Sequence, residues 1–428
     1  MTLSLLSADR TVPALDRVAV VSVLLTPLLL LHAHGFAEAS MAVATLCFLG
    51  HAALTRQWGW LATPWTRMGL IWSGWLVICS MPIPALGLGE GGWPSFGQAA
   101  MTVRFPLFLA TMEHYALRDP RARLWLRNIV AAGALYIAAN CLFQFVVGRN
   151  LYGHSLQGSD TLTGPFGKSR AGPPLARMLM PALATPLVAL LGRRERWSSP
   201  LAYALMLSAI AVMVLIGQRM PLVLALAGMA IVGLLLRPLR PVVLAGGLAG
   251  MLLLAASPVV APIAYNRLVV QFAALLEKFP SSHYGELYTR ALEIGIQHPV
   301  TGRGFDSFRY GCEQPRYFRA SLDGKDADGG GAAICAAHPH NFYVQALADG
   351  GFVGLALFCT LALTWLMPLA RGLWRGSTPI RVGLFASIVV QLFPFQSTGG
   401  FYTLPLGGWF FLLLGWGLAE FRHRVPEA

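Results

Sequence analysis

Long apolar segments recur along almost the whole chain, and this pattern constrains the fold more than any other feature. A helix needs about 20 apolar residues to cross the hydrocarbon core of a bilayer. Segments of about this length are residues 16–33, 37–54, 67–84, 98–116, 125–147, 172–192, 199–216, 221–236, 241–262, 342–369, 379–396 and 404–420. The pattern therefore predicts an all-α polytopic integral membrane protein with about twelve transmembrane helices.

One long apolar region has to be divided. Residues 201–236 are almost continuously apolar, and a single helix of that length would far exceed a core of ~30 Å at ~1.5 Å per residue. The sequence Gly-Gln-Arg-Met-Pro at 217–221 interrupts the region and predicts a hairpin. Pro221 suits the first turn of the second helix, because its missing amide has no partner there anyway.

An even number of spans places both termini on one side of the membrane, and the arginines indicate which side. Every segment between spans on that side is short and basic. These segments contain Arg10, Arg17, Arg56, Arg67, Arg118, Arg121, Arg123, Arg127, Arg193, Arg194, Arg196, Arg237, Arg240, Arg371, Arg375, Arg381, Arg422 and Arg424. By the positive-inside rule this side is cytoplasmic, and the long polar segment lies on the outer face. The expected division is 1–262 with nine helices, 263–340 as a large loop and 341–428 with three helices.

The net charge of +13 does not indicate a nucleic-acid partner. The arginines flank apolar segments and are not gathered in one soluble domain, which is the membrane-protein pattern. Residues are 56% hydrophobic and only 12% charged, about half the usual charged share. Membrane lipid is therefore the expected surrounding of this chain.

The long loop contains two helical patterns and two cysteines. Residues 266–278 are amphipathic and are expected along the membrane interface, and residues 284–297 predict a second short helix. Cys312 and Cys335 could form a disulfide if the loop faces an oxidising compartment. The other cysteines lie in apolar segments as core thiols: Cys47, Cys79, Cys141 and Cys359.

Two histidines stand where the loop meets the tenth apolar segment, in the sequence His338-Pro339-His340-Asn341. Asn341 is a good helix N-cap, and the free amides of that helix end attract anions. The same positive end disfavours a second positive charge, so a nearby imidazole should stay neutral near pH 7. A neutral imidazole beside an anion site is a candidate general base. Alone, such a histidine would more simply be a capping residue.

Some cations are not explained by the positive-inside rule, because they lie within a span or on the outer face. Arg219 and Arg290 are the strongest candidates for binding a phosphate, since outer-face carboxylates are few and a guanidinium can grip phosphate with two hydrogen bonds. Further candidate substrate contacts are Arg104, Lys168, Arg170, Arg177, Arg303 and Asn341. For Lys168 and Arg177, snorkelling or a local ion pair is the simpler interpretation.

Metal and nucleotide chemistry have little support in the sequence. Neither an HExxH sequence nor a GxxxxGK[ST] loop occurs, and no carboxylate cluster offers Mg²⁺ an oxygen cage. Asp326 and Asp328 have a DxD spacing, but they lie in a glycine-rich run. The sequence therefore predicts no metal and no cofactor.

At these residues the chain resembles the bacterial O-antigen ligase family. His340-Asn341, followed after nine residues by Gly351 and then by Gly354, is similar to the histidine signature of that family. Residues 288–305, with Arg290, His298-Pro299 and Gly302-Arg303-Gly304-Phe305, resemble a block shared with O-antigen polymerases. Residues 164–173 resemble the loop before the sixth span, and Gln218-Arg219 occupies the place of a Ser-Arg pair in the hairpin.

The resemblance implies a metal- and ATP-independent, inverting glycosyl transfer on the periplasmic face of the bacterial inner membrane. The donor would be a polysaccharide on undecaprenyl diphosphate, and the acceptor a sugar hydroxyl of lipid A-core. His340 would be the general base, with Arg219 and Arg290 on the diphosphate. His338, two residues away, could exchange roles with His340 and act as the base or as a phosphate contact.

Three alternatives to a ligase stay open at this point. A polymerase or an O-oligosaccharyltransferase of the same superfamily would use a similar fold, although the histidine signature favours the ligase. A twelve-span transporter of an anionic substrate could line its path with Arg104 and Arg177. The transporter is less favoured, because the chain has no evident inverted repeat and its polar residues are concentrated on one face.

Overall fold

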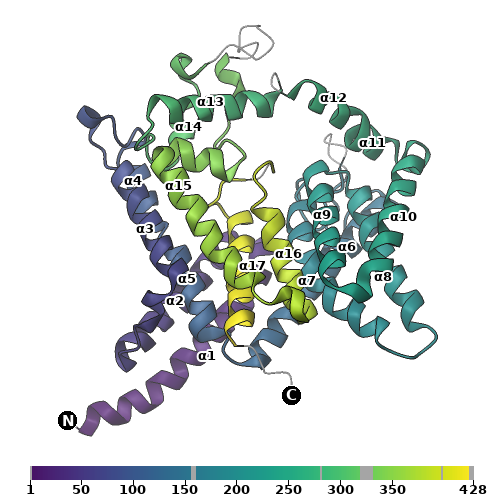
Figure 1. Ribbon diagram of the computed structural model, residues 1–428, viewed down its shortest axis with the longest axis horizontal. Helices are drawn as coiled ribbons and strands as arrows, with labels where there is room; N and C mark the ends of the chain where they lie inside the picture. Colours follow the sequence, from purple (N-terminus) through teal and green to yellow (C-terminus); the bar gives the residue numbers. More distant parts are fainter. Residues whose placement is uncertain (1, 156–160, 280–281, 319–330, 397–398, 424–428) are drawn as a thin grey trace.

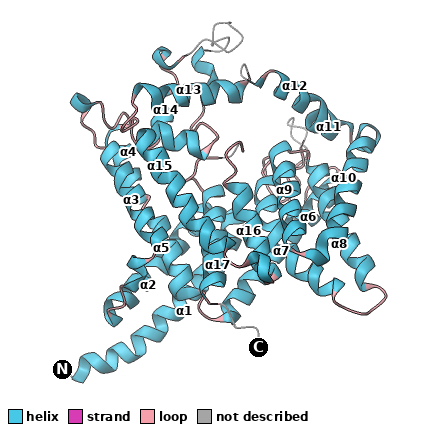
Figure 2. Cartoon of the chain, in the orientation of Figure 1, coloured by secondary structure: helices cyan, strands magenta, loops and turns pink. Residues whose placement is uncertain are grey.

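The computed structural model describes residues 2–155, 161–279, 282–318, 331–396 and 399–423. Helices and loops make up these parts of the chain, without a β-strand, as Figure 2 shows, apart from one isolated bridge between Arg149 and Ser155. The prediction of an all-α polytopic membrane protein is confirmed. Arg424, Asp326 and Asp328 lie outside the described residues.

Each predicted apolar segment contains helix, although the segment 98–116 is divided among three short helical elements. Seven of the helices in the described residues are long and apolar enough to cross a membrane: α1 (Thr2–His32), α2 (His34–Thr55), α6 (Pro120–Val147), α7 (Gly172–Leu191), α8 (Ser198–Ile216), α10 (Arg240–Val260) and α15 (Phe342–Ala370). The others are shorter: α3 (Pro64–Cys79), α4 (Gly92–Met101), α5 (Arg104–Thr111), α9 (Arg219–Leu235), α16 (Pro379–Gln391) and α17 (Leu406–Arg422). The predicted hairpin is present between α8 and α9.

The large loop forms the end of the molecule opposite the chain termini. It contains α11 (Pro262–Tyr265), α12 (Gln271–Glu277), α13 (His283–Gln297) and α14 (Ser307–Gly311). In Figure 1 these helices run across the top, from α10 to α15, while the N- and C-terminal ends lie at the bottom. The two helices expected in the loop therefore correspond to α12 and α13.

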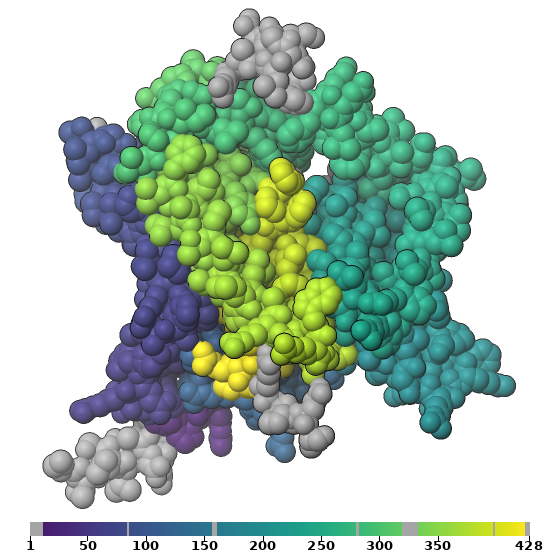
Figure 3. Space-filling view, viewed as in Figure 1, coloured from purple at the N-terminus to yellow at the C-terminus, as the bar shows by residue number. Residues whose placement is uncertain are grey.

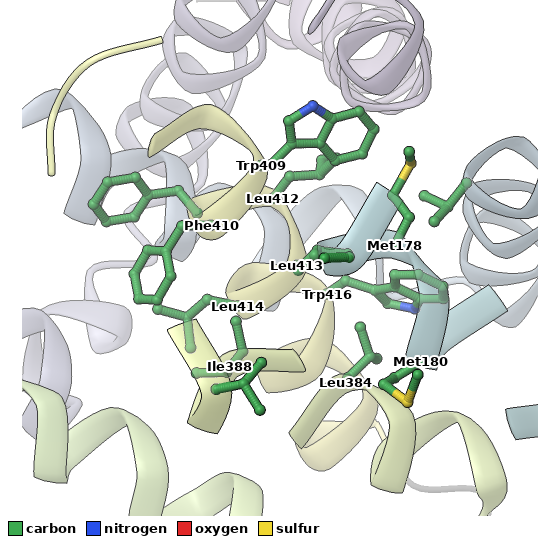
Figure 4. Packing of buried hydrophobic residues seen from close by; sticks show 14 of the residues in the cluster. Met178, Met180, Leu384, Ile388, Trp409, Phe410, Leu412, Leu413, Leu414 and Trp416 are labelled. Atoms are coloured by element: carbon green, nitrogen blue, oxygen red, sulfur yellow. The ribbon is translucent and has the colours of Figure 1, made fainter. Parts of the chain in front are cut away.

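A fully buried helix occupies the centre of the bundle. All residues from Gly407 to Ala419 in α17 are buried, so this helix is apolar on every side. In Figure 4, Trp416 lies close to Met180 of α7 and Leu384 of α16, whereas the Phe410 ring packs 5.7 Å from that of Trp365 in α15. Because close-packed interiors resist deformation, α17 provides a rigid support for the segment that precedes it.

The loop also has a small hydrophobic core of its own. Its buried members are Leu287, Ala291, Ile294, Phe308, Cys312, Tyr317 and Ala348. Ala348 belongs to α15, whereas the others belong to the loop. This core therefore fixes α13 against the first part of α15, where the two histidines lie.

Candidate functional site

Asn341 caps α15 as the sequence predicts. Its side-chain oxygen accepts hydrogen bonds from the backbone amides of Tyr343 at 2.9 Å and Val344 at 3.2 Å. Its amide nitrogen donates to the Pro394 carbonyl at 2.6 Å. One side chain thus satisfies the helix end and ties it to the segment after α16.

The signature glycine Gly351 breaks α15 near its start. Its backbone has φ 68° and ψ −166°, a conformation open almost only to glycine. The break frees three carbonyls, of Ala348, Asp349 and Gly350. They accept hydrogen bonds from the Arg303 amide at 3.0 Å, the Gly304 amide at 3.0 Å and the Trp75 indole at 2.9 Å, respectively.

The two glycine-containing motifs, around Gly302 and Gly351, therefore meet at the break in α15, which we call the joint. Gly302 has φ +56°, and a Cβ there would collide with the Ala348 carbonyl. The joint separates the half-helix 342–350 from the rest of α15, and the positive end of that half-helix adjoins His340. The spacing between the histidine and the glycines has a structural reason, because it sets the length of this half-helix.

Replacing Gly351 with alanine is expected to destabilise the protein by about 2–5 kcal/mol. The new Cβ would lie 2.5 Å from the Val300 carbonyl carbon and would also force a strained backbone. A thermal unfolding midpoint in detergent measures the loss. Gly247→Ala is the matched control, because Gly247 lies in α10 with no atom within 4 Å of its Cβ position. An equal, small effect of both changes would contradict this role of the joint.

The two histidines lie against each other. Their ring centroids are 4.5 Å apart, and the His340 ring forms a T-shaped pair with the Tyr284 ring of α13, with centroids 5.4 Å apart. His340 has φ +57°, which is uncommon for a residue with a side chain and marks a position held by its surroundings.

His338 is half-buried and faces a cavity of about 430 Å³. Its Nε2 atom is buried without a hydrogen-bond partner within the described part of the chain. Burial, followed by the charges of His340 and Arg309, lowers the pKa of His338 to about 4. His338 is therefore neutral at pH 7 and available for a hydrogen bond with a ligand.

Arg219 begins α9 and reaches across to the loop. Its guanidinium donates to the Arg267 carbonyl at 2.8 Å and to the Gln271 side-chain oxygen at 2.7 Å. It also lies within electrostatic range of Tyr284, the residue that touches His340. Its hydrogen-bond partners are neutral, so its positive charge is not cancelled.

Arg267 is a second cation at this place, which sequence reasoning assigned only to the interfacial helix. It lies in a π-helical turn, Asn266–Val270, and such turns are frequent at functional sites. Its charge acts on Arg219, and neither arginine forms an ion pair with a carboxylate among the described residues. Two adjacent like charges fit a doubly charged anion such as a diphosphate. The only signal in the sequence was one arginine, Arg267, at the start of the amphipathic segment 266–278.

Arg290 lies in the core of the loop. It is 1% exposed, and its guanidinium donates to the Cys312 carbonyl at 3.0 Å and packs over the Phe318 ring at 4.2 Å. On α13 it points about 120° away from Tyr284, at ~100° per residue. The structure therefore gives Arg290 partners that hold the loop together, which differs from its expected place beside Arg219.

Cys312 and Cys335 are joined by a disulfide, with Cα atoms 5.7 Å apart. Arg290 also lies 3.2 Å from the Cys335 sulfur, so the disulfide and the arginine belong to one cluster. The described free cysteines are Cys47, Cys79, Cys141 and Cys359.

Thiol labelling tests this pairing directly. Of the six cysteines, four are expected to react in unfolded, unreduced protein, and all six after reduction. The mass of the labelled protein gives the count. Six reactive thiols before reduction would show that the pair is not oxidised in the purified protein.

Two of the other candidates form ion pairs with carboxylates of the protein. Arg303 forms a two-pronged ion pair with Glu90 at 3.0 and 3.1 Å. Arg104 pairs with Glu38 at 2.7 Å and also lines the cavity that His338 faces. Arg303 is thus held by a carboxylate of the protein, and Arg104 is held by Glu38 at the wall of the cavity.

The remaining basic candidates divide by exposure. Arg177 is buried in α7 and donates to the Gln391 side chain at 2.8 Å and the Pro173 carbonyl at 2.9 Å. Lys168 and Arg170 are exposed on the loop before α7. Among the described residues, no group of three or more His, Cys, Asp or Glu side chains could hold a metal ion.

Fold and site together define a polytopic helical membrane protein with a histidine pair and spare guanidinium charge at its loop end. Residues 182–359 match the family model described as O-antigen ligase, which supports the resemblance to that family seen in the sequence. The match includes Arg219, Arg267, Arg290, both histidines and Gly351. A search of curated proteins finds no match.

Proposed function

We propose that the protein is an O-antigen ligase, which moves a polysaccharide from undecaprenyl diphosphate to lipid A-core. The family supports a glycosyltransferase-like membrane enzyme of the ligase and polymerase superfamily. The observation that carries the proposal is the position of Arg219 near Tyr284, whose ring contacts His340 of a histidine pair at a helix N-terminus.

The proposed reaction is a direct displacement at the anomeric carbon of the donor sugar. His340 takes the proton of the acceptor hydroxyl while that oxygen forms a bond to the carbon. The bond from this carbon to the diphosphate oxygen breaks, and the diphosphate leaves with the electron pair. One displacement inverts the anomeric configuration, and the sugar–diphosphate bond supplies the driving force without ATP.

His340 suits the base better than His338 does. A general base works best when its pKa lies near the working pH, and the pKa of His338 is lowered to about 4. His340 also adjoins Tyr284, and thus the side where Arg219 lies. Arg219 and Arg267 would bind the diphosphate and stabilise the charge that develops on it. Arg290 would act by positioning α13.

The shape of the molecule supports access for a lipid donor. Figure 3 shows an opening below the loop helices, between teal α9 and the yellow segment that precedes α17. Arg219 of α9 donates a hydrogen bond to the Gln271 side chain of α12, which joins α9 to the loop. A diphosphate in a membrane-bound donor could reach Arg219 from the side, with the loop in the periplasm and the termini in the cytoplasm.

The test is transfer by the purified full-length protein in detergent, from lipid-linked glycan to lipid A-core, with EDTA and without nucleotide. Glycosylated lipid A-core is the expected product. A lengthened donor would instead indicate a polymerase, and the absence of any transfer would favour a transporter.

A further inference from the structure

His338 lines a cavity that neither Tyr284 nor Arg219 lines, whereas Tyr284 contacts His340, the other member of the histidine pair. The cavity volume of about 430 Å³ is in the range of small-ligand sites, ~300–1,000 Å³. Its walls come from α4, α5, the start of α14, the residues before α15 and the segment before α17. A Cβ at Gly400 would lie 3.6 Å from the His338 ring, so this last segment closes over the histidine.

The lining of the cavity suits a sugar. Phe105, Phe305 and Tyr402 form an aromatic group, with ring centroids 5.2 and 5.9 Å from that of Tyr402. The Tyr402 hydroxyl accepts from the Trp72 indole at 2.7 Å, which fixes the ring. Gln345 adds a polar group to the wall. Rigid aromatic faces beside hydrogen-bonding groups fit a ring with both apolar and hydroxyl-bearing surfaces.

Positive charge exceeds negative charge in this lining. Arg104 and Arg309 are both present, whereas Asp306 is the acid among the lining residues. Asp306 pairs with Arg309 at 2.8 Å, and Glu38, the partner of Arg104, stands outside the lining. A guanidinium with one carboxylate partner retains donors for a second anion.

We infer that this cavity binds the acceptor, and that Arg104 and Arg309 hold an anionic substituent, a phosphate or a carboxylate, on a sugar next to the accepting one. The inference rests on the proposed function and adds the location and the charge requirement of the acceptor. His338 contacts the acceptor from the cavity wall. The accepting hydroxyl thereby lies between the cavity and His340, opposite the diphosphate.

Arg309→Gln and Arg104→Gln are expected to raise the KM for lipid A-core about ten- to a hundredfold, because each loses charge-assisted hydrogen bonds. The KM for the donor should not change. Arg316→Gln is the matched control: its side chain is 48% exposed against 51% for Arg309, and both pair with a carboxylate of the protein. Arg316 does not line the cavity.

Chemical changes to the acceptor identify the anion. Wild-type protein should bind one of two modified acceptors more weakly, either dephosphorylated or carboxyl-reduced lipid A-core. The affinity of Arg309→Gln should not change with the modification that weakens binding to the wild type. Direct binding of delipidated core oligosaccharide, measured by calorimetry, gives the same comparison without turnover. Binding without any transfer would support the cavity while contradicting the ligase proposal.

Two results would overturn the inference. One is an unchanged acceptor KM and unchanged core binding in both Arg104→Gln and Arg309→Gln. The other is an effect of these variants on the donor KM alone, which would assign the cavity to the donor glycan.

Discussion

Replacing His340 with alanine is expected to lower kcat by about 10²–10⁴-fold, the usual contribution of a general base. Expression and the thermal midpoint should stay close to wild type, because the helix cap is provided by Asn341. Transfer to lipid A-core at saturating substrates measures the effect. His283→Ala is the matched control, since His283 is an exposed histidine beside Tyr284 on α13.

The pH profile separates the two histidines. With its pKa lowered to about 4, mainly by burial, His338 is already unprotonated at pH 5. If His338 were the base, kcat/KM would be constant from pH 8 down to about pH 5 and would fall only near pH 4. A decline that begins well above pH 5 would exclude His338. Full activity of His340→Ala, with loss in His338→Ala, would assign the base to His338.

Replacing Arg219 with alanine is expected to lower kcat/KM by about 10²–10³-fold, the effect of removing one group that stabilises developing charge. Lysine should restore only part of the activity, because an ammonium cannot make the two parallel hydrogen bonds of a guanidinium. Arg267→Ala should raise the donor KM by about tenfold, since it removes the second cation of the pair. Initial rates at varied donor concentration measure both.

The control for Arg219 is Gln271→Ala, because Arg219 also ties α9 to α12 through the Gln271 oxygen. This change removes the tie but keeps the charge. Near-wild-type activity is expected. If Gln271→Ala lost as much activity as Arg219→Ala, the arginine would act as a structural tie, and its role on the diphosphate would be contradicted.

Much of the fold could be predicted from local patterns. The length of the apolar segments predicted the spans, Pro221 the hairpin and Asn341 the start of α15. Each of these signals depends on a few neighbouring residues. The break at Gly351 could not be predicted, because three partners from distant segments stabilise it. Residues 342–369 therefore looked like one continuous helix.

The site was less predictable for the same reason. Arg219 and Arg290 look alike in sequence, as outer-face arginines without an obvious acid. The packing of α13 on the loop core directs Arg290 to the disulfide cluster, and that orientation depends on tertiary contacts. Arg267 comes beside Arg219 only because the loop folds back over α9. The spacing of the motifs therefore predicted neither the orientation of Arg290 nor the position of Arg267 beside Arg219.

A cryo-electron microscopy structure with undecaprenyl diphosphate bound to the full-length protein tests the central claim most directly. The account predicts diphosphate density in contact with Arg219 and Arg267, on the Tyr284 side of His340, with the lipid tail leaving through the opening beside α9. Diphosphate bound away from both arginines, or on the far side of the molecule from the histidine pair, would contradict it.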